Sequence, residues 1–198
     1  METFFAVAGM LTVGAITPGP NNFVVLRTAA KAGLSGAFPA IAGIILGSLG
    51  LLLLAAAGGA VLFDLLPGLR LALALAGSLY LACLGLQLIA ASFGPNGEGE
   101  AGLRLPAGIA GLAAFQFLNP KSWVLALTAV AAMPPSSPLV LLQLAGLFVV
   151  IPATCLLLWS SCGALMMRAL ANGRISSWFD RVMGGTLAAS AAALIMSA

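Results

Sequence analysis

The chain has 198 residues, of which 62% are hydrophobic and 7% are charged, and its mean hydropathy is +1.15. These values lie outside the range of soluble domains and indicate an integral membrane protein. Most charged residues fall in or beside short polar segments, so the net charge of +3 fits cytoplasmic loops rich in Lys and Arg rather than a nucleic-acid partner. The chain has no histidine, and its three cysteines form no CxxC motif, so we expect no metal, no disulfide framework and no cofactor.

Apolar runs of transmembrane length follow one another along the chain. Each run reaches or exceeds the ~20 residues that a helix needs to cross a bilayer, and together they cover about residues 3–30, 36–62, 67–91, 105–133, 138–167 and 178–197. Glu2 stands where a signal peptide would carry basic residues, so we expect the first run to be retained. Because backbone groups in lipid must be satisfied within each segment, the sequence predicts an all-α integral membrane protein with six transmembrane helices.

One polar linker divides these runs into two groups of three. It covers about residues 93–104, so a single transporter domain of residues 1–198 would contain one repeat at about 1–92 and a second at about 105–198. When the first half is shifted by 102 residues, Pro18 falls on Pro120, and further short matches follow in order with slowly growing offsets. Each match is weak in a chain rich in Ala, Gly and Leu, and coincidence stays open as the alternative. Repeats of three helices, an odd number, must sit in the membrane with opposite orientations.

The matched prolines predict a break in the first and fourth transmembrane helices. Pro18, Pro20 and Pro120 lack the backbone N–H that would close a helical hydrogen bond, and their rings crowd the preceding turn. Pro18 and Pro120 each follow a charged residue by sixteen positions, which at 1.5 Å per residue is about 24 Å into a hydrocarbon core of ~30 Å. Irregular backbone at that depth is tolerated where it is buried in protein or lines a cavity, so we expect the inverted repeats to bring the two breaks face to face.

Three stretches of the chain resemble the lysine exporter family, also called the threonine/homoserine exporter family. They are ITPGPNNFVVLRTAAKAGLSGAFPAIAGIILG near the N-terminus, AGSLYLACLGLQLI in the third run and FQFLNPKSWVLALTAV in the fourth. The Pro-Gly-Pro of the first stretch and the Asn-Pro-Lys of the last carry most of the resemblance, which extends over nearly the whole chain. The resemblance implies a small transporter of the bacterial inner membrane that exports amino acids or related metabolites, with a substrate that differs among members.

We expect the substrate to bind at the two breaks, because a broken helix offers partners for both charges of an amino acid. N–H groups at the start of the second half-helix attract a carboxylate, and carbonyls at the end of the first attract an ammonium. The expected donors lie near Asn21, Asn22, Lys121 and Ser122, and the expected carbonyls are those of Ala15, Ile16, Phe117 and Leu118. A second interpretation is that Asn21 and Asn22 cap the half-helix that they begin. The candidate substrate-binding residues are Thr17, Pro18, Gly19, Pro20, Asn21, Asn22, Gln116, Asn119, Pro120 and Lys121.

Lys121 is the charged residue that lies well inside an apolar run. A lysine at mid-helix costs about 2.5–3.5 kcal/mol on insertion scales, and snorkelling of the long side chain reduces that cost. Two interpretations stay open. Either Lys121 caps carbonyls at the break or snorkels to the surface, or it meets a substrate carboxylate or a relayed proton.

Other polar, small and aromatic residues have simpler interpretations. Ser, Thr and Gln in membrane helices more often join neighbouring helices than bind ligand, and the weaker candidates for the transport path are Ser78, Tyr80, Gln87, Gln116 and Thr128. We expect close helix packing at Gly43, Gly47 and Gly50, packing or interfacial roles for Trp123, Trp159 and Trp178, and simple kinks at Pro39, Pro67 and Pro152.

An enzymatic function is not expected. A thiol redox enzyme needs cysteines near the breaks, and the first and fourth runs contain none. An intramembrane protease needs a histidine or paired aspartates, and we expect no acidic residue of this chain to be buried. A carrier for a different small metabolite, or a channel-like membrane protein, stays open as the alternative to an amino-acid exporter.

The distribution of basic residues predicts the orientation. If the loop after the first run, the central linker and the loop after the fifth run are cytoplasmic, nearly all Lys and Arg residues are inside and both termini are periplasmic. Without a buried acid, the site is expected to favour neutral zwitterionic amino acids over dibasic ones. Such an amino acid and the lipid bilayer are the expected partners, and homo-oligomerisation stays open.

Overall fold

The computed structural model describes residues 1–59, 61, 65–93, 108–170 and 172–197, and this part of the chain is built of helices and contains no strand. The predicted all-α class is therefore confirmed. The elements in chain order are α1 (Glu2–Ile16), α2 (Pro20–Leu54), the π-helical turn η1 (Ala55–Gly59), α4 (Pro67–Ala91), α5 (Gly108–Leu118), α6 (Pro120–Ala132), α7 (Pro138–Leu165), α8 (Met167–Leu170) and α9 (Gly173–Ser197).

The chain leaves the helical conformation at both places where the prolines predict a break. The first break, residues 17–19, separates α1 from α2, and the backbone of Thr17 and Gly19 is extended there. The second break is Asn119 alone, with φ −89° and ψ 105°, between α5 and α6. Pro20 and Pro120 then stand in the first turn of the new helix, where a missing N–H leaves no hydrogen bond unmade and the fixed φ suits the helix.

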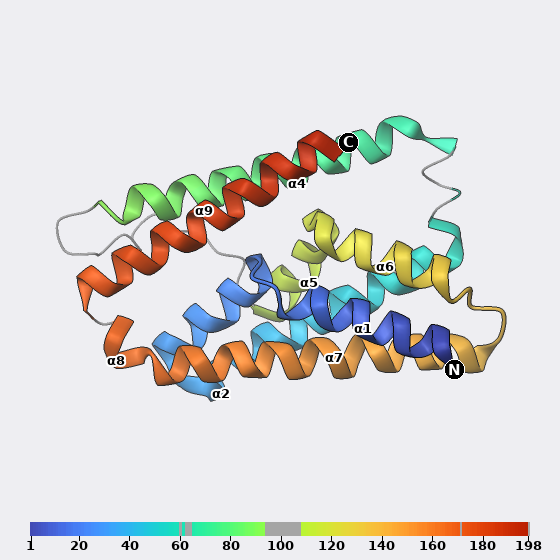
Figure 1. The fold of residues 1–198 in the computed structure, drawn as a ribbon, viewed down its shortest axis with the longest axis horizontal. Coiled ribbons are helices and arrows are strands. Elements are labelled where there is room, and N and C mark those ends of the chain that lie inside the picture. Colours follow the sequence, from blue (N-terminus) through green and yellow to red (C-terminus); the bar gives the residue numbers. More distant parts are fainter. Residues whose placement is uncertain (60, 62–64, 94–107, 171, 198) are drawn as a thin grey trace.

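A bend at Gly33 divides α2 into two arms. The φ of Gly33 is 73°, in the left-handed region that residues with a Cβ rarely adopt. The first arm, residues 20–32, therefore runs toward one end of the molecule, and the second arm, residues 34–54, runs back toward the other (Figure 1). The bend falls between residues 30 and 36, where the sequence predicts the first loop.

Within the described chain, two helices are long and apolar enough to cross a membrane, judged by length and composition alone. They are Pro20–Gly58 and Pro138–Leu165, whereas Glu2–Ile16, Leu75–Ala91 and Gly108–Leu118 are shorter apolar helices. The sequence predicts six spans, and the two breaks explain part of the difference, because they divide the first and fourth apolar runs into shorter helices. The arrangement of six spans as two inverted repeats stays a prediction.

Glycines bring the backbones of neighbouring helices into contact. α2 packs against α7 and α5, while α4 pairs with α9 (Figure 1). A Cβ on Gly163 of α7 would lie 2.1 Å from a carbonyl oxygen of the first arm, and one on Gly47 would lie 2.4 Å from the carbonyl oxygen of Ala113 in α5. Gly43 is also in close contact with the α5 backbone, and Gly50 packs against the side chain of Phe117 in α5. The predicted close packing at Gly43, Gly47 and Gly50 is confirmed, and it fixes the second arm against the helix that leads into the second break.

A buried ion pair joins the first arm of α2 to α9. Arg27, 8% exposed, donates to the carboxylate of Asp180, 4% exposed, and to the hydroxyl of Ser176. Its guanidinium carbon also lies 5.8 Å from the ring centroid of Phe23 and 5.5 Å from that of Phe179. The expectation that no acidic residue is buried is wrong for Asp180, because Arg27, 153 residues away in the sequence, supplies the opposite charge that makes a buried carboxylate tolerable.

Two of the predicted cytoplasmic loops lie at the same end of the molecule. The bend at Gly33, α8 and the start of α9 gather in the left half of Figure 1, and both chain termini lie in its right half. The central linker, predicted at residues 93–104, falls outside the described residues apart from its first position.

Candidate functional site

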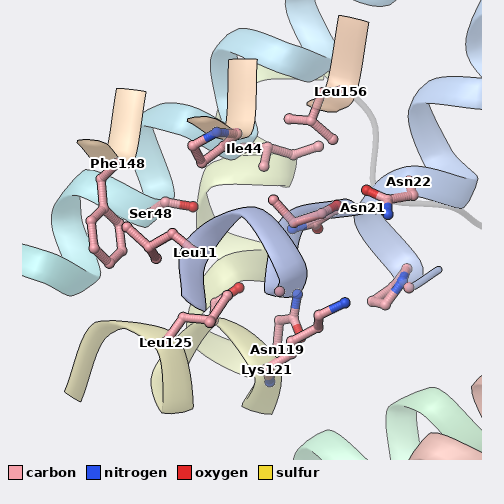
Figure 2. A pocket seen from close by; sticks show the side chains of 16 residues that line it. Leu11, Asn21, Asn22, Ile44, Ser48, Asn119, Lys121, Leu125, Phe148 and Leu156 are labelled. Carbon is pink, nitrogen blue, oxygen red and sulfur yellow. Dashed lines mark hydrogen bonds between the residues drawn. The ribbon is translucent and has the colours of Figure 1, made fainter. Parts of the chain in front are cut away.

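The two helix breaks lie against each other and are joined by side chains (Figure 2). Asn21 and Gln116 form a reciprocal pair, in which the amide nitrogen of each donates to the amide oxygen of the other at 3.0 Å. The Nζ atom of Lys121 donates to the carbonyl oxygen of Thr17 at 2.9 Å and to its hydroxyl oxygen at 2.8 Å. Segments 95 to 104 residues apart in the sequence therefore meet at one place.

Three of the four carbonyls predicted to receive a substrate ammonium already accept a hydrogen bond from the protein. Their donors are Asn22 Nδ2 for Ala15 at 3.0 Å, the Trp159 indole for Ile16 at 3.2 Å and the Trp123 indole for Phe117 at 2.8 Å. Each carbonyl keeps a second lone pair. Trp123 and Trp159 thus have a role beyond the packing predicted for them, since their N–H groups satisfy backbone acceptors exposed by the breaks.

The backbone donors at the two breaks differ. At the second break, the N–H of Lys121 donates to Asn119 Oδ1 at 3.2 Å, and the N–H of Ser122 donates to the Asn119 carbonyl oxygen at 3.0 Å. These two predicted donors are therefore occupied, because Asn119 caps α6. The start of α2 has no side-chain cap, and within the described residues the N–H groups of Asn21 and Asn22 have no hydrogen-bond partner. The Asn21 and Asn22 side chains do not cap α2, since they bond to α5 and to the end of α1.

Gln116 connects the two breaks from the interior of the protein. Its side chain is 0% exposed. The amide pairs with Asn21, its oxygen also accepts from the hydroxyl of Ser122 at 2.8 Å, and its nitrogen also donates to the carbonyl oxygen of Leu112 at 3.3 Å. Gln116 therefore holds the two broken helices together, and its polar atoms are already used by the protein.

A cavity of about 60 Å³ lies beside the two breaks and is walled by α1, both arms of α2, α6 and α7 (Figure 2). The predicted substrate residues that line it are Gly19, Pro20, Asn21, Asn22, Asn119 and Lys121. The other four predicted residues do not line the cavity. Thr17 and Gln116 form hydrogen bonds with residues that do. Pro18 is exposed, and Pro120 packs against Gly77 of α4. Sites for small molecules usually measure ~300–1,000 Å³, so this cavity has room for a few waters and would have to widen to admit an amino acid.

The far wall of the cavity was not predicted from the sequence. It consists of Leu11, Ile44, Ser48, Leu125, Phe148, Pro152 and Leu156. In the sequence these residues look like ordinary members of apolar runs, and no motif distinguishes them. Pro152, for which a simple kink was expected, lies in the interior of α7 and contributes to this wall. The signal that could have found it is a proline in the middle of a transmembrane run, the same signal that marks the breaks.

A family model for LysE type translocators matches residues 12–198. The chain belongs to the LysE family. This family consists of membrane transporters, so the resemblance seen in the Pro-Gly-Pro and Asn-Pro-Lys stretches is confirmed.

Curated relatives match shorter parts of this LysE family member. A leucine efflux protein of Klebsiella pneumoniae is 38% identical over 91 residues, which cover 43% of this chain and 43% of the relative. An uncharacterized membrane protein of Pseudomonas aeruginosa is 38% identical over 74 residues, which cover 37% of this chain and 34% of the relative. The chain thus spans less than half the length of these curated relatives in the alignments. No solved structure matches it.

In this LysE family member, the position of Lys121 agrees in part with each of the two interpretations offered by the sequence. It caps the Thr17 carbonyl, as the structural interpretation requires, and it also lines the cavity. Among the described residues, no carboxylate lies within 4.0 Å of its ammonium group. An ammonium carries three donors, and Thr17 takes two of them. Within the described residues, no hydrogen-bond partner is found for the third donor.

Proposed function

We propose that this LysE family member is a secondary carrier of the bacterial inner membrane that exports amino acids or closely related small metabolites. Membership of a translocator family and the likeness to a leucine efflux protein support this proposal. The observation that carries it is the cavity at the breaks, where Lys121 and the uncapped N–H groups of Asn21 and Asn22 lie opposite an apolar wall.

An amino acid fits this arrangement in one orientation. Its carboxylate accepts hydrogen bonds from Lys121 and from the start of α2, where the aligned peptide dipoles attract negative charge. Its ammonium faces the second lone pair of the Ala15 carbonyl, which also borders the cavity. Its side chain lies against the apolar wall. Because the cavity must widen to admit the molecule, binding is coupled to a change of shape, as alternating access requires.

The first test of this proposal concerns charge on the cargo. We expect neutral amino acids to be exported at least about tenfold faster than lysine or arginine, because a second cation would meet Lys121 and an uncompensated buried charge costs several kcal/mol. Counterflow of labelled amino acids into liposomes that contain the purified protein measures this preference. Preferential transport of lysine or arginine would contradict it.

The same assay separates the proposal from its alternatives. A carrier saturates and shows counterflow, whereas a channel-like protein gives flux that rises linearly with concentration and shows no counterflow. Saturable transport of an unrelated metabolite, with no transport of any amino acid, would replace the proposed cargo and leave the carrier mechanism in place.

A second proposal concerns the arrangement in the membrane. Residues 1–198 would form one transporter domain of two inverted repeats, 1–92 and 105–198, with both termini in the periplasm. The basic residues Arg174 and Arg181 lie in α9, whose start is at the same end of the molecule as α8 and the bend in α2 (Figure 1). A cluster of this kind is expected on the cytoplasmic side.

Cysteine labelling tests that orientation. In a variant with Cys83, Cys155 and Cys162 replaced by alanine, Ser136→Cys on the loop before α7 should react with an impermeant maleimide added to intact cells. Ser35→Cys beside the bend should react only after the membrane is opened. Both serines are exposed, so accessibility to solvent is matched. The reverse labelling pattern would overturn the orientation and weaken the case for inverted repeats.

A further inference from the structure

The hydroxyl of Ser48 differs from most other helix hydroxyls of this protein. Hydroxyls that donate to the carbonyl three or four residues earlier are those of Thr12, Thr17, Thr28, Ser92, Thr154, Ser160, Ser161, Ser177, Thr186 and Ser190. This local bond is the usual way to satisfy such a group in an apolar helix. Ser48 is 9% exposed, and its hydroxyl has no hydrogen-bond partner in the described part of the chain.

Ser48 lies on the wall of the cavity at the two breaks. It belongs to the second arm of α2, one turn beyond Ile44, and Figure 2 shows it beside Leu11 and Phe148 among the side chains that surround the cavity. The preceding residue, Gly47, is in contact with the α5 backbone, since a Cβ there would lie 2.4 Å from the Ala113 carbonyl oxygen. That contact prevents the second arm from rotating and keeps Ser48 on the cavity side.

The surroundings of Ser48 make its hydroxyl available to a ligand. The other described residues of this wall are apolar, and the remaining polar groups of the lining belong to the breaks and to the start of α6. Among the described residues, the fully buried hydroxyls without a partner are those of Ser78 and Tyr80, whereas Ser48 lines a cavity of about 60 Å³ that has room for water to pair with its hydroxyl. Cargo that displaces this water must either replace its hydrogen bond or leave the hydroxyl unpaired.

We propose that Ser48 is a specificity-determining residue whose hydroxyl pairs with a hydrogen-bonding group on the side chain of the cargo. This inference rests on the proposed function, with the cargo carboxylate at Lys121 and its side chain at the far wall. The favoured cargo is a small neutral amino acid with one hydroxyl or amide in its side chain. An apolar molecule of the same shape displaces the water and leaves Ser48 unsatisfied.

Isosteric pairs of amino acids isolate this effect. Threonine and valine have nearly the same shape and differ in a hydroxyl, and asparagine and leucine differ in an amide. Counterflow of all four would be measured in liposomes with the wild-type protein, Ser48→Ala and Ser160→Ala. Ser160 is a matched control, because it is 0% exposed, does not line the cavity, and donates its hydroxyl to the Leu156 carbonyl.

We expect the wild-type protein to prefer the polar member of at least one pair. Ser48→Ala should reduce that preference by roughly 3- to 10-fold, the effect of one neutral hydrogen bond, through slower transport of the polar member with transport of its apolar partner retained. Ser160→Ala should leave the preference unchanged. Retained valine or leucine transport shows that the Ser48→Ala protein is folded.

Three results would overturn the role of Ser48 and leave the proposed function standing. They are an apolar preference in the wild-type protein, an unchanged preference in Ser48→Ala, and an equal loss of both members of each pair, which would indicate a structural effect. If the wild-type protein transports no amino acid at all, the proposed function fails, and the role of Ser48 fails with it.

Discussion

We expect Lys121→Met to lower amino-acid transport by roughly 10- to 150-fold, the equivalent of one charged hydrogen bond of about 1.5–3 kcal/mol. The protein should remain folded and inserted, because the substitution leaves no acceptor unpaired. The Thr17 carbonyl still accepts from Asn22 at 2.8 Å, and the Thr17 hydroxyl still donates to the carbonyls of Val13 and Gly14. Removal of a cation from an apolar helix also favours insertion.

Two measurements separate a transport defect from a structural one. Counterflow in liposomes at equal protein content measures transport, and thermal unfolding in detergent reports on folding. Lys121→Arg serves as the conservative control, since it keeps the charge but replaces a compact ammonium by a planar guanidinium, and partial activity is expected. If Lys121→Met transports at the wild-type rate with unchanged affinity, the lysine only caps the first break and the carboxylate binds elsewhere.

Arg27→Met should destabilise the protein by about 3–5 kcal/mol, the usual effect of leaving a buried charge without its partner. The substitution leaves the Asp180 carboxylate, 4% exposed, without its counter-charge between α2 and α9. It also removes the contacts of the guanidinium with the rings of Phe23 and Phe179. The unfolding temperature of the purified protein should fall accordingly.

The double variant Arg27→Met with Asp180→Leu is the control for this prediction. Replacement of a buried ion pair by apolar residues of similar volume is often neutral or stabilising, so the second substitution should restore most of the lost stability. A double variant that is less stable than Arg27→Met would show that the two residues do not act as a pair. Equal unfolding temperatures for Arg27→Met and the wild type would show that burial of Asp180 needs no counter-charge.

The backbone around the site followed from the sequence because its causes are local. Prolines lack the N–H of a helical hydrogen bond, so the Pro-Gly-Pro and Asn-Pro motifs predicted the breaks at residues 17–19 and at Asn119 without knowledge of the fold, whereas the single prolines Pro39 and Pro152 lie inside α2 and α7. A short polar segment predicted a loop after the first apolar run. The bend between the two arms of α2 lies in that segment, at Gly33, which tolerates the left-handed conformation.

The side-chain partners at the site could not be predicted, because they come from distant parts of the chain. The amide of Gln116 meets Asn21 across 95 residues, and the indole of Trp159 reaches the end of α1 across 143. The backbone N–H groups of Lys121 and Ser122, which were predicted to bind the substrate, donate to Asn119 instead, because Asn119 caps the helix that follows it. Ser48 gave no signal because one hydroxyl in an apolar run is usually satisfied by its own helix.

In the proposed carrier, the hydrogen bonds between the two breaks would limit how the cavity can open. The Asn21–Gln116 pair contributes two bonds, and Lys121 contributes two more to Thr17. A rocking motion that pulled the two broken helices apart would break all four of these bonds at once. We therefore expect the broken helices to move as one body, with access from either side of the membrane controlled by the helices that surround them. These hydrogen bonds favour a transport cycle in which the broken helices stay together while the surrounding helices move.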